Sequence, residues 1–291
     1  MVRFAALFLV VLSVTAFWLV ASGKIYGVYR LIYAGSHAPD QILSYPAAQG
    51  GHPLDVLVHL PAEWSNGADH PAIVLFHGGA WRAGSPWQLS GLAHGLADQG
   101  YVVLLPTYRM AVTDKAGISD SVADAAAFFG WLPDQVEALK IVPSRLAVGG
   151  SSAGGFLALA AYAKHGEAPP PGPVVLINPA INLDKGTLTK NWNRLSQPSN
   201  ITPEVLLSLD PANTIGHLGG PCLILHGTDD RVIPLAWVEA HAEAWEQNGG
   251  GCTLSRFEGR GHGFATNPFG NADRRAVVEQ VSLFLRSHTA E

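Results

Sequence analysis

The 291-residue chain has few charged side chains, few cysteines and no run of basic residues. Charged residues make up 14% of the sequence, against about 25% in typical soluble domains. Without a basic stretch, and with a formal net charge of −5, nucleic-acid binding has little electrostatic support. Two cysteines exclude a disulfide-rich framework, and no Cys/His cluster indicates structural zinc. Hydrophobic residues reach 48%, which excludes intrinsic disorder and predicts a large packed core.

One long uncharged apolar run stands at the N-terminus, from Phe4 to Ser22. A run of roughly 18 or more such residues can cross a bilayer as a helix, whereas signal-peptide cores are shorter, about 7–15 residues. We therefore expect residues 1–23 to be a membrane anchor, followed by a juxtamembrane linker over residues 24–40. A cleaved signal segment is the second alternative, and a buried core helix is the least favoured.

The basic residues around this run leave its orientation open. Arg3 and the free amine precede the run, while Lys24 and Arg30 follow it, so the positive-inside count is a tie. Because signal-like segments usually start translocation, we favour export. The expected location of the protein is therefore membrane-anchored or extracytoplasmic.

Beyond residue 40, short β-rich runs alternate with alanine-rich helical stretches. Predicted strands cover residues 55–60, 72–76, 102–105, 146–148, 174–177, 223–225 and 253–257. Predicted helices cover residues 88–99, 119–131, 153–164, 235–248 and 274–287. Continuously apolar strands that alternate with helices predict an α/β fold, with a mostly parallel sheet flanked by helices on both faces. An earlier run at residues 42–45 would form an antiparallel edge strand.

A single catalytic domain would then cover residues 41–291. One interval inside it, residues 180–219, is far longer than the usual connection of about 2–6 residues. Because long loops in compact domains are often functional, we predict a lid over a site, with a surface excursion as the alternative.

The strongest candidate motif is glycine-rich and follows the predicted strand that ends at Val148. It contains one G-x-S-x-G frame, from Gly150 to Gly154, centred on Ser152. On a sharp turn between a strand and a helix, such a serine exposes its hydroxyl, and the helix N-terminus beginning near Ala153 favours negative charge there. Ser152 is therefore the candidate nucleophile, and an ordinary glycine-rich turn is the alternative interpretation.

A second glycine-rich motif, HGGAW at residues 77–81, follows another predicted strand. Paired glycines let the backbone approach a reacting carbonyl closely, so that N–H groups can bind an oxyanion. The candidate donors are Gly78 and Gly79, with Ala80 as an alternative, and the N–H of Ala153 after the nucleophile. We interpret His77 as a hydrogen-bonding residue that organises the loop, and an ordinary turn remains the alternative for the motif.

Two further loops supply carboxylates and an imidazole. Asp229 and Asp230 follow the predicted strand at residues 223–225, and position alone does not separate them. His262 lies between glycines after the predicted strand at residues 253–257. The order serine, aspartate, histidine, each after a different strand, is the chain order of the α/β-hydrolase triad.

From about Ser44 onward, the chain resembles the α/β-hydrolase superfamily through its motifs HGGAW, GGSSAGG, HGTDDRVIP and GHGF. These motifs look like the carboxylesterase branch near the hormone-sensitive-lipase-like and feruloyl-esterase-type enzymes. The resemblance implies Ser152 as the nucleophile, His262 as the base, no metal and no organic cofactor. In its H-G-x-x-D pattern the fifth residue is the acid, which is Asp230.

We therefore predict a serine esterase that cleaves small to medium carboxylic esters, with Trp81 and Trp87 lining an apolar pocket. An H-G-G-x-W loop also resembles that of kynurenine formamidases, so a formamidase or amidase on the same triad is the alternative. A non-catalytic interaction protein on a hydrolase fold is less favoured, because no triad member is missing. The expected partners are a small ester and, through the N-terminal run, a membrane. The sequence makes no prediction of oligomeric state.

The two cysteines, Cys222 and Cys252, each stand next to the start of a predicted strand. We expect these strands to be neighbours, and aligned registers would bring the Cα atoms to about the 4.4–6.8 Å that disulfides require. A bridge between parallel strands also needs a favourable twist, so we favour buried free thiols.

Overall fold

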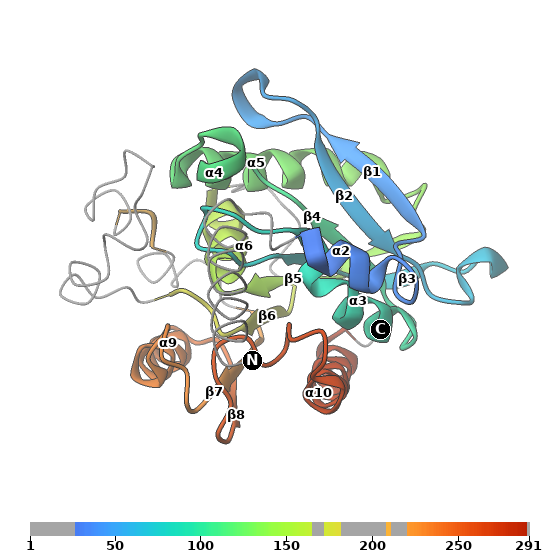
Figure 1. The fold of residues 1–291 in the computed structure, drawn as a ribbon. Helices are drawn as coiled ribbons and strands as arrows, with labels where there is room; N and C mark the ends of the chain where they lie inside the picture. The colour runs from blue at the N-terminus through green and yellow to red at the C-terminus, as the bar shows by residue number, and fades with distance from the viewer. Residues whose placement is uncertain (1–26, 165–171, 182–207, 211–219, 290–291) are drawn as a thin grey trace, which may run out of the picture.

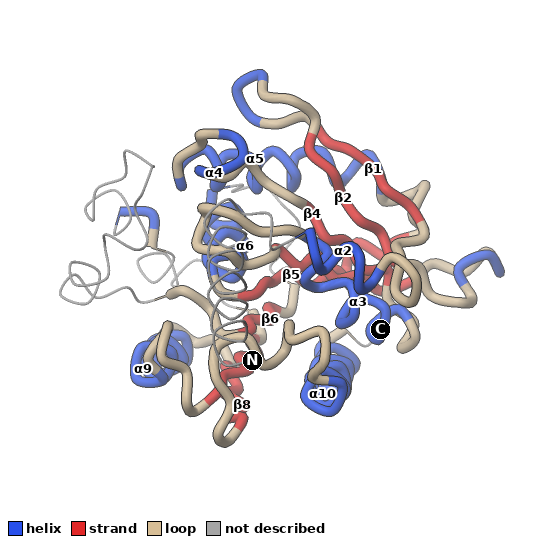
Figure 2. The backbone as a smooth tube through the Cα atoms, viewed as in Figure 1, coloured by secondary structure: helices blue, strands red, loops and turns tan. Residues whose placement is uncertain are grey.

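The computed structural model describes residues 27–164, 172–181, 208–210 and 220–289, and the structural statements below concern these residues. A twisted eight-stranded sheet runs through the molecule, with helices on both of its faces (Figures 1 and 2). The predicted α/β fold is thereby confirmed.

The sheet is mostly parallel, with an antiparallel part at one edge. Its order is β1-β2-β4-β3-β5-β6-β7-β8, and every neighbouring pair from β4 to β8 is parallel. The strands are β1 (Gln41–Tyr45), β2 (Leu54–His59), β3 (His70–Phe76), β4 (Val102–Pro106), β5 (Ile141–Ser151), β6 (Val174–Ile177), β7 (Cys222–Gly227) and β8 (Cys252–Phe257).

The antiparallel edge is wider than the sequence predicted. Strand β1 is the expected edge strand, but β2 is also antiparallel to both of its neighbours, β1 and β4. A parallel return to the same sheet needs a crossover of about a dozen or more residues. Only residues 46–53 join β1 to β2, so these two strands pair as a hairpin.

Two apolar layers hold the helices against the sheet. Helices α3 (Ser90–Ala97) and α10 (Asn271–His288) cover one face. Helices α5 (Ile118–Trp131), α6 (Ala153–Lys164) and α9 (Leu235–Gln247) cover the other. Because β4 and β6 are buried along their whole length, their sequences are continuously apolar rather than alternating.

The helix predictions hold within a few residues, with one difference. The helix predicted over residues 88–99 is a 3₁₀ turn, Pro86–Leu89, followed by α3. Ser85 caps that turn, because its hydroxyl accepts the Trp87 N–H at 3.3 Å. The short helix α4 (Ala111–Asp114) was not predicted.

The predicted anchor at residues 1–23 lies outside the described residues, as does most of the predicted lid at residues 180–219. No helix within the described ranges has the length and apolar character to cross a membrane. Part of the predicted linker forms α2 (Gly27–Tyr33). This helix contacts the catalytic domain, because Arg274 donates to the Tyr33 hydroxyl at 3.3 Å.

The preference for free thiols is wrong, because Cys222 and Cys252 form a disulfide. Their strands, β7 and β8, are parallel neighbours, as expected, and the two cysteines are direct partners in the register. This places their Cα atoms 4.3 Å apart, close to the range in which disulfides form.

Candidate active site

Three side chains from three different connections meet at the carboxyl edge of the sheet. The imidazole Nε2 of His262 lies 2.9 Å from the Ser152 hydroxyl oxygen, and its Nδ1 lies 2.7 Å from Oδ2 of Asp230. Ser152 comes from the turn between β5 and α6, Asp230 follows β7, and His262 follows β8. The structure thus brings together the three residues that the sequence singled out.

The turn that carries Ser152 is sharp. Ser152 has a φ of +53°, which is rare for a residue with a side chain. Gly154 faces the end of β3 so closely that a Cβ there would overlap the carbonyl of Phe76. The second glycine of the G-x-S-x-G frame is therefore required by close packing against the neighbouring strand.

The carboxylate of Asp230 is buried, and each of its two oxygens accepts two hydrogen bonds. Its Oδ1 accepts the backbone N–H groups of Val232 and Ile233 at 2.8 and 2.9 Å. Its Oδ2 accepts the Asn178 amide at 2.9 Å in addition to His262. Burial alone would raise the pKa of Asp230, but the His262 hydrogen bond and charge and the other donors lower it to about 2. The carboxylate is therefore ionised at neutral pH.

Asp229 has a different environment from its neighbour. It is exposed, and its backbone N–H donates to the carbonyl of Arg260 at 3.0 Å. The geometry therefore brings Asp230, and not Asp229, to the imidazole.

The loop of Gly78 and Gly79 lies directly against the nucleophile turn. A Cβ on Gly78 would lie 3.1 Å from Ser152 Cβ, and Gly79 has a φ of +127°, a conformation that favours glycine. Among the described backbone hydrogen bonds outside regular helices and strands, none is donated by the N–H of Gly78, Gly79 or Ala153. These three N–H groups therefore remain the candidate donors to a ligand beside Ser152.

His77 is hydrogen-bonded to this loop and packs against Tyr108. Its buried imidazole donates from Nδ1 to the Gly78 carbonyl at 2.8 Å and stacks on the Tyr108 ring at 4.4 Å. The Tyr108 hydroxyl in turn donates to the His77 carbonyl at 2.9 Å. Burial lowers the pKa of His77 to about 4, so the ring is neutral at physiological pH. These contacts agree with an organising role for His77.

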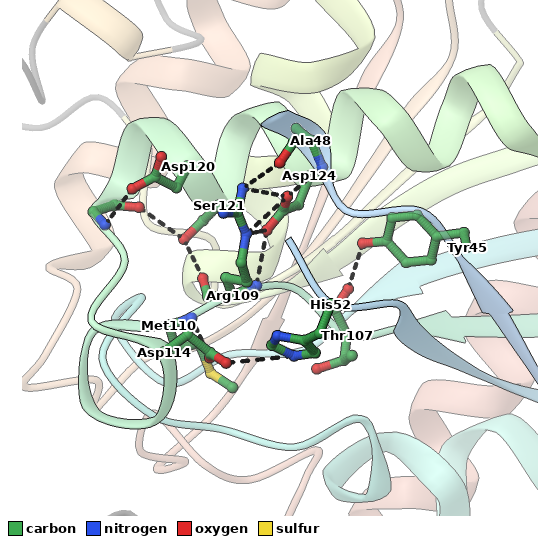
Figure 3. Close-up of polar contacts among 11 residues, drawn as sticks. Tyr45, Ala48, His52, Thr107, Arg109, Met110, Asp114, Asp120, Ser121 and Asp124 are labelled. Carbon is green, nitrogen blue, oxygen red and sulfur yellow. Dashed lines mark hydrogen bonds and ion pairs between the residues drawn. The ribbon is translucent and has the colours of Figure 1, made fainter. Parts of the chain in front are cut away.

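An ion pair between the fully buried carboxylate of Asp124 and the partly buried guanidinium of Arg109 holds the segment that carries Tyr108 (Figure 3). The guanidinium of Arg109 donates to the carboxylate of Asp124 on α5, with the shortest contact at 2.8 Å. The same carboxylate accepts the backbone N–H groups of Ala48 and Arg109. The Arg109 guanidinium also donates to the Ala48 carbonyl at 3.0 Å. These contacts fix helix α5 to the loop after β4. Through Tyr108, this loop contacts His77, which precedes Gly78 and Gly79.

Ser152 and His262 open into a cavity of about 390 Å³. Its described lining is mixed polar and apolar: Tyr29, Gly78, Gly79, Ala80, Arg82, Ala83, Gln88, Val112, Ser151, Ser152, Val232, His262, Gly263 and Thr266. No cluster of three His, Cys, Asp or Glu side chains suited to a metal occurs among the described residues.

The two tryptophans expected in the pocket are not among its lining residues. Ala80 and Trp81 both have positive φ, near +55°, and the Trp81 indole lies in the core, edge-to-face with Phe156 at 5.0 Å. Trp87 lies under the guanidinium of Arg30 at 5.9 Å. The prediction of a tryptophan-lined apolar pocket is therefore wrong for the described lining.

Asn178 is the polar neighbour of the site that the sequence did not reveal. It directly follows β6 at the same edge of the sheet as the other site residues, which is the one signal that could have identified it. His226, at the end of β7, is also buried, and its Nε2 donates to the carbonyl of Ile233 at 3.1 Å. Burial lowers the pKa of His226.

Residues 73–266 match the model of the alpha/beta hydrolase fold family. The solved structure of an esterase from Thermogutta terrifontis, Est2 with butyrate bound, is similar, with a TM-score of 0.70 and 27% identity. The similarity covers 87% of this chain and 94% of that one.

Two curated relatives match by sequence. An ethyl acetate hydrolase of Pseudomonas putida is 35% identical over 131 residues, which is 44% of this chain and 40% of that protein. A probable isoprenylcysteine alpha-carbonyl methylesterase of Oryza sativa subsp. japonica is 26% identical over 76% of this chain and 58% of that protein. The chain thus spans less than two thirds of either relative.

Proposed function

The chain belongs to the α/β-hydrolase fold family, as its motifs predicted, and on that premise we propose that it is a serine hydrolase that cleaves carboxylic esters. The observation that carries the proposal is the imidazole of His262, hydrogen-bonded to Ser152 on one side and to Asp230 on the other. The similarity to an ethyl acetate hydrolase and to a solved esterase supports an ester as the substrate.

In the first step, His262 accepts the hydroxyl proton of Ser152 at Nε2 while the serine oxygen attacks the ester carbonyl. Asp230 accepts the Nδ1–H, which holds the required tautomer and stabilises the imidazolium that forms. The N–H groups of Gly78, Gly79 and Ala153 stabilise the negative charge on the former carbonyl oxygen.

In the second half of the reaction, the imidazolium of His262 donates its proton to the leaving alcohol. The acyl group then remains on Ser152 as an ester. His262, now neutral, deprotonates a water molecule that attacks this ester. As the tetrahedral intermediate collapses, the imidazolium returns the proton to the Ser152 oxygen, which releases the carboxylic acid and the free serine. Each proton transfer takes place at Nε2 of His262, while its Nδ1–H stays hydrogen-bonded to Asp230.

A panel of p-nitrophenyl esters with acyl chains from two to twelve carbons tests this proposal, with N-formylkynurenine as the amide-type substrate. Because the cavity is about 390 Å³, we expect kcat/KM to be highest for short to medium chains. Ser152→Ala is the control, and its activity should disappear on every substrate. Preferential cleavage of N-formylkynurenine would favour the formamidase alternative, and no turnover of any substrate would favour a non-catalytic role.

We further propose that the protein is exported and held at a membrane. The uncharged run from Phe4 to Ser22 supports this location, and the disulfide between Cys222 and Cys252 suits an oxidising compartment. The full-length protein should sediment with membranes after an alkaline carbonate wash. Recovery of the chain with Met1 intact in the soluble fraction would contradict this location, whereas a mature chain that begins at Gly23 would replace the anchor with a cleaved signal.

A further inference from the structure

Asn178 is hydrogen-bonded to the carboxylate of the proposed triad. Its side-chain Nδ2 donates to Oδ2 of Asp230 at 2.9 Å, across 52 residues of sequence. The same oxygen accepts Nδ1–H of His262 at 2.7 Å. Asn178 is fully buried, so water does not compete for this contact. A single carboxylate oxygen is therefore shared between the imidazole and one neutral amide.

The backbone around Asn178 is fixed to the same catalytic edge. Its own N–H donates to the carbonyl of Leu225 on β7 at 2.9 Å. The residue before it, Ile177, accepts the N–H of Ser152 at 2.9 Å, and Ala180 donates to the Ser152 carbonyl at 3.1 Å. The residues at the C-terminal end of β6 and just after it thus contact Ser152 through backbone hydrogen bonds, and Asp230 through the side chain of Asn178.

Both the conformation and the amide orientation of this residue are specific. Asn178 has a φ of +45°, a left-handed conformation that asparagine tolerates better than most residues. With the opposite amide orientation, Oδ1 would face a carboxylate oxygen and two acceptors would repel each other. In the present orientation, Oδ1 is buried without a hydrogen-bond partner among the described residues. The amide orientation that allows Nδ2 to donate to Asp230 therefore leaves the side-chain oxygen of Asn178 without a hydrogen-bond partner among the described residues.

The remaining donors to Asp230 do not replace this contact. The N–H groups of Val232 and Ile233 bond to Oδ1, the other carboxylate oxygen. His226 is the second titratable group that faces the carboxylate, with its Nε2 3.7 Å from Oδ2, but this nitrogen donates to the Ile233 carbonyl. Apart from His262, Asn178 is thus the one described side chain that donates to Oδ2.

We propose that Asn178 is a positioning residue, whose amide holds Oδ2 of Asp230 in the orientation that receives Nδ1–H of His262. Without the amide, Oδ2 has one donor fewer, and the carboxylate is freer to rotate away from the imidazole. This inference rests on the proposed serine-hydrolase function. It assigns no contact between Asn178 and the substrate.

A double-mutant cycle between Asn178→Ala and Asp230→Asn tests whether Asn178 acts through the acid. In the wild-type background, Asn178→Ala should lower kcat up to about 100-fold, the scale of a small misplacement of a catalytic group. KM should change little, because Asn178 does not line the cavity. In the Asp230→Asn background, the same substitution should change kcat by less than about 3-fold, because the carboxylate on which it acts is gone.

Asn178→Asp supplies a second readout that a merely structural role would not change. This variant keeps the shape and the tolerance of positive φ, but when ionised it places a second negative charge beside Asp230. When protonated, the new carboxyl can again donate to Oδ2. We therefore expect the ratio of kcat/KM for the variant to that for wild type to rise as the pH falls.

Asn248→Ala is the matched control, because it also removes an asparagine amide that donates a hydrogen bond, to Ala244 at the end of α9. Its activity should equal that of wild type. If Asn178→Ala leaves kcat unchanged, or lowers it equally in both backgrounds, the positioning role is wrong. A pH-independent ratio for Asn178→Asp would equally overturn it. If Asp230→Asn itself retains full activity, the proposed triad fails instead, so the two failures are distinguishable.

Discussion

Removing the carboxylate of Asp124 should destabilise the protein strongly. This side chain is fully buried and accepts hydrogen bonds from the Arg109 guanidinium and from the backbone N–H groups of Ala48 and Arg109 (Figure 3). Asp124→Ala leaves a largely buried guanidinium without its counter-charge. Breaking a buried ion pair in this way costs about 3–5 kcal/mol.

That loss would be a large share of the stability of a typical domain, which is about 5–15 kcal/mol. Urea unfolding followed by circular dichroism measures it as a drop in midpoint at an unchanged slope. The matched control is Glu239→Ala, which removes an exposed carboxylate paired with Arg256. An exposed pair contributes about 0–1 kcal/mol, so this variant should remain close to wild type.

The reasoning is refuted if Asp124→Ala costs less than about 1 kcal/mol, or no more than the control. A change of slope without a change of midpoint would also count against it, because it would indicate an altered denatured state rather than a lost ion pair. Arg109 follows Tyr108, whose hydroxyl donates to the His77 carbonyl beside the loop of Gly78 and Gly79. We therefore also expect Asp124→Ala to lower kcat at temperatures at which the variant is still folded.

Three further predictions concern the acid, the cysteines and pH. Asp230→Asn should fold normally but lower kcat by up to about 10⁴, since it favours the wrong imidazole tautomer. Asp229→Asn should lower kcat much less. Steady-state kinetics measure both variants, and reversed effects would assign the acid to Asp229. Thiol titration of the denatured, non-reduced protein should find no free thiol, and two free thiols would exclude the Cys222–Cys252 bridge. The folded-state pKa of Asp230 is lowered from 3.8 to about 2, so its contribution to stability is present above about pH 4 and is lost as the pH falls towards 2. Urea midpoints between pH 2 and 5 should therefore decline less in Asp230→Asn than in wild type, and parallel profiles would contradict this linkage.

The sequence predicts the parallel part of the fold because burial on both faces leaves a direct compositional signal. The run Val174–Ile177 is apolar throughout, and it forms β6 at the predicted residues. Strand β2 carries no comparable signal of its direction. Its antiparallel pairing follows from the short connection to β1, because these two strands are neighbours in the sheet.

Motif context also located the residues that meet at the site, because each follows a different strand at one edge of the sheet. The separation of Asp230 from Asp229 came from a family pattern and not from spacing, and the structure gives the physical distinction: one is buried beside His262, and the other is exposed.

Contacts set by tertiary placement could not be predicted. The Asn178 amide reaches Asp230 across two neighbouring strands, and no local pattern records that pairing. Ala80 and Trp81 have positive φ, and the Trp81 indole lies in the core, although the sequence predicted it in a pocket wall. The cysteine bridge likewise depended on the exact register of β7 and β8. In each case the deciding quantity was the relative position of two elements.

Covalent labelling with a fluorophosphonate, followed by peptide mass spectrometry, tests the central claim most directly, because the reagent reacts with a serine activated by a neighbouring base. The proposed mechanism predicts one adduct on Ser152, abolished by Ser152→Ala, strongly slowed by His262→Ala and retained by Ser151→Ala. An adduct on Ser151, or labelling of the intact chain that survives Ser152→Ala, would contradict it.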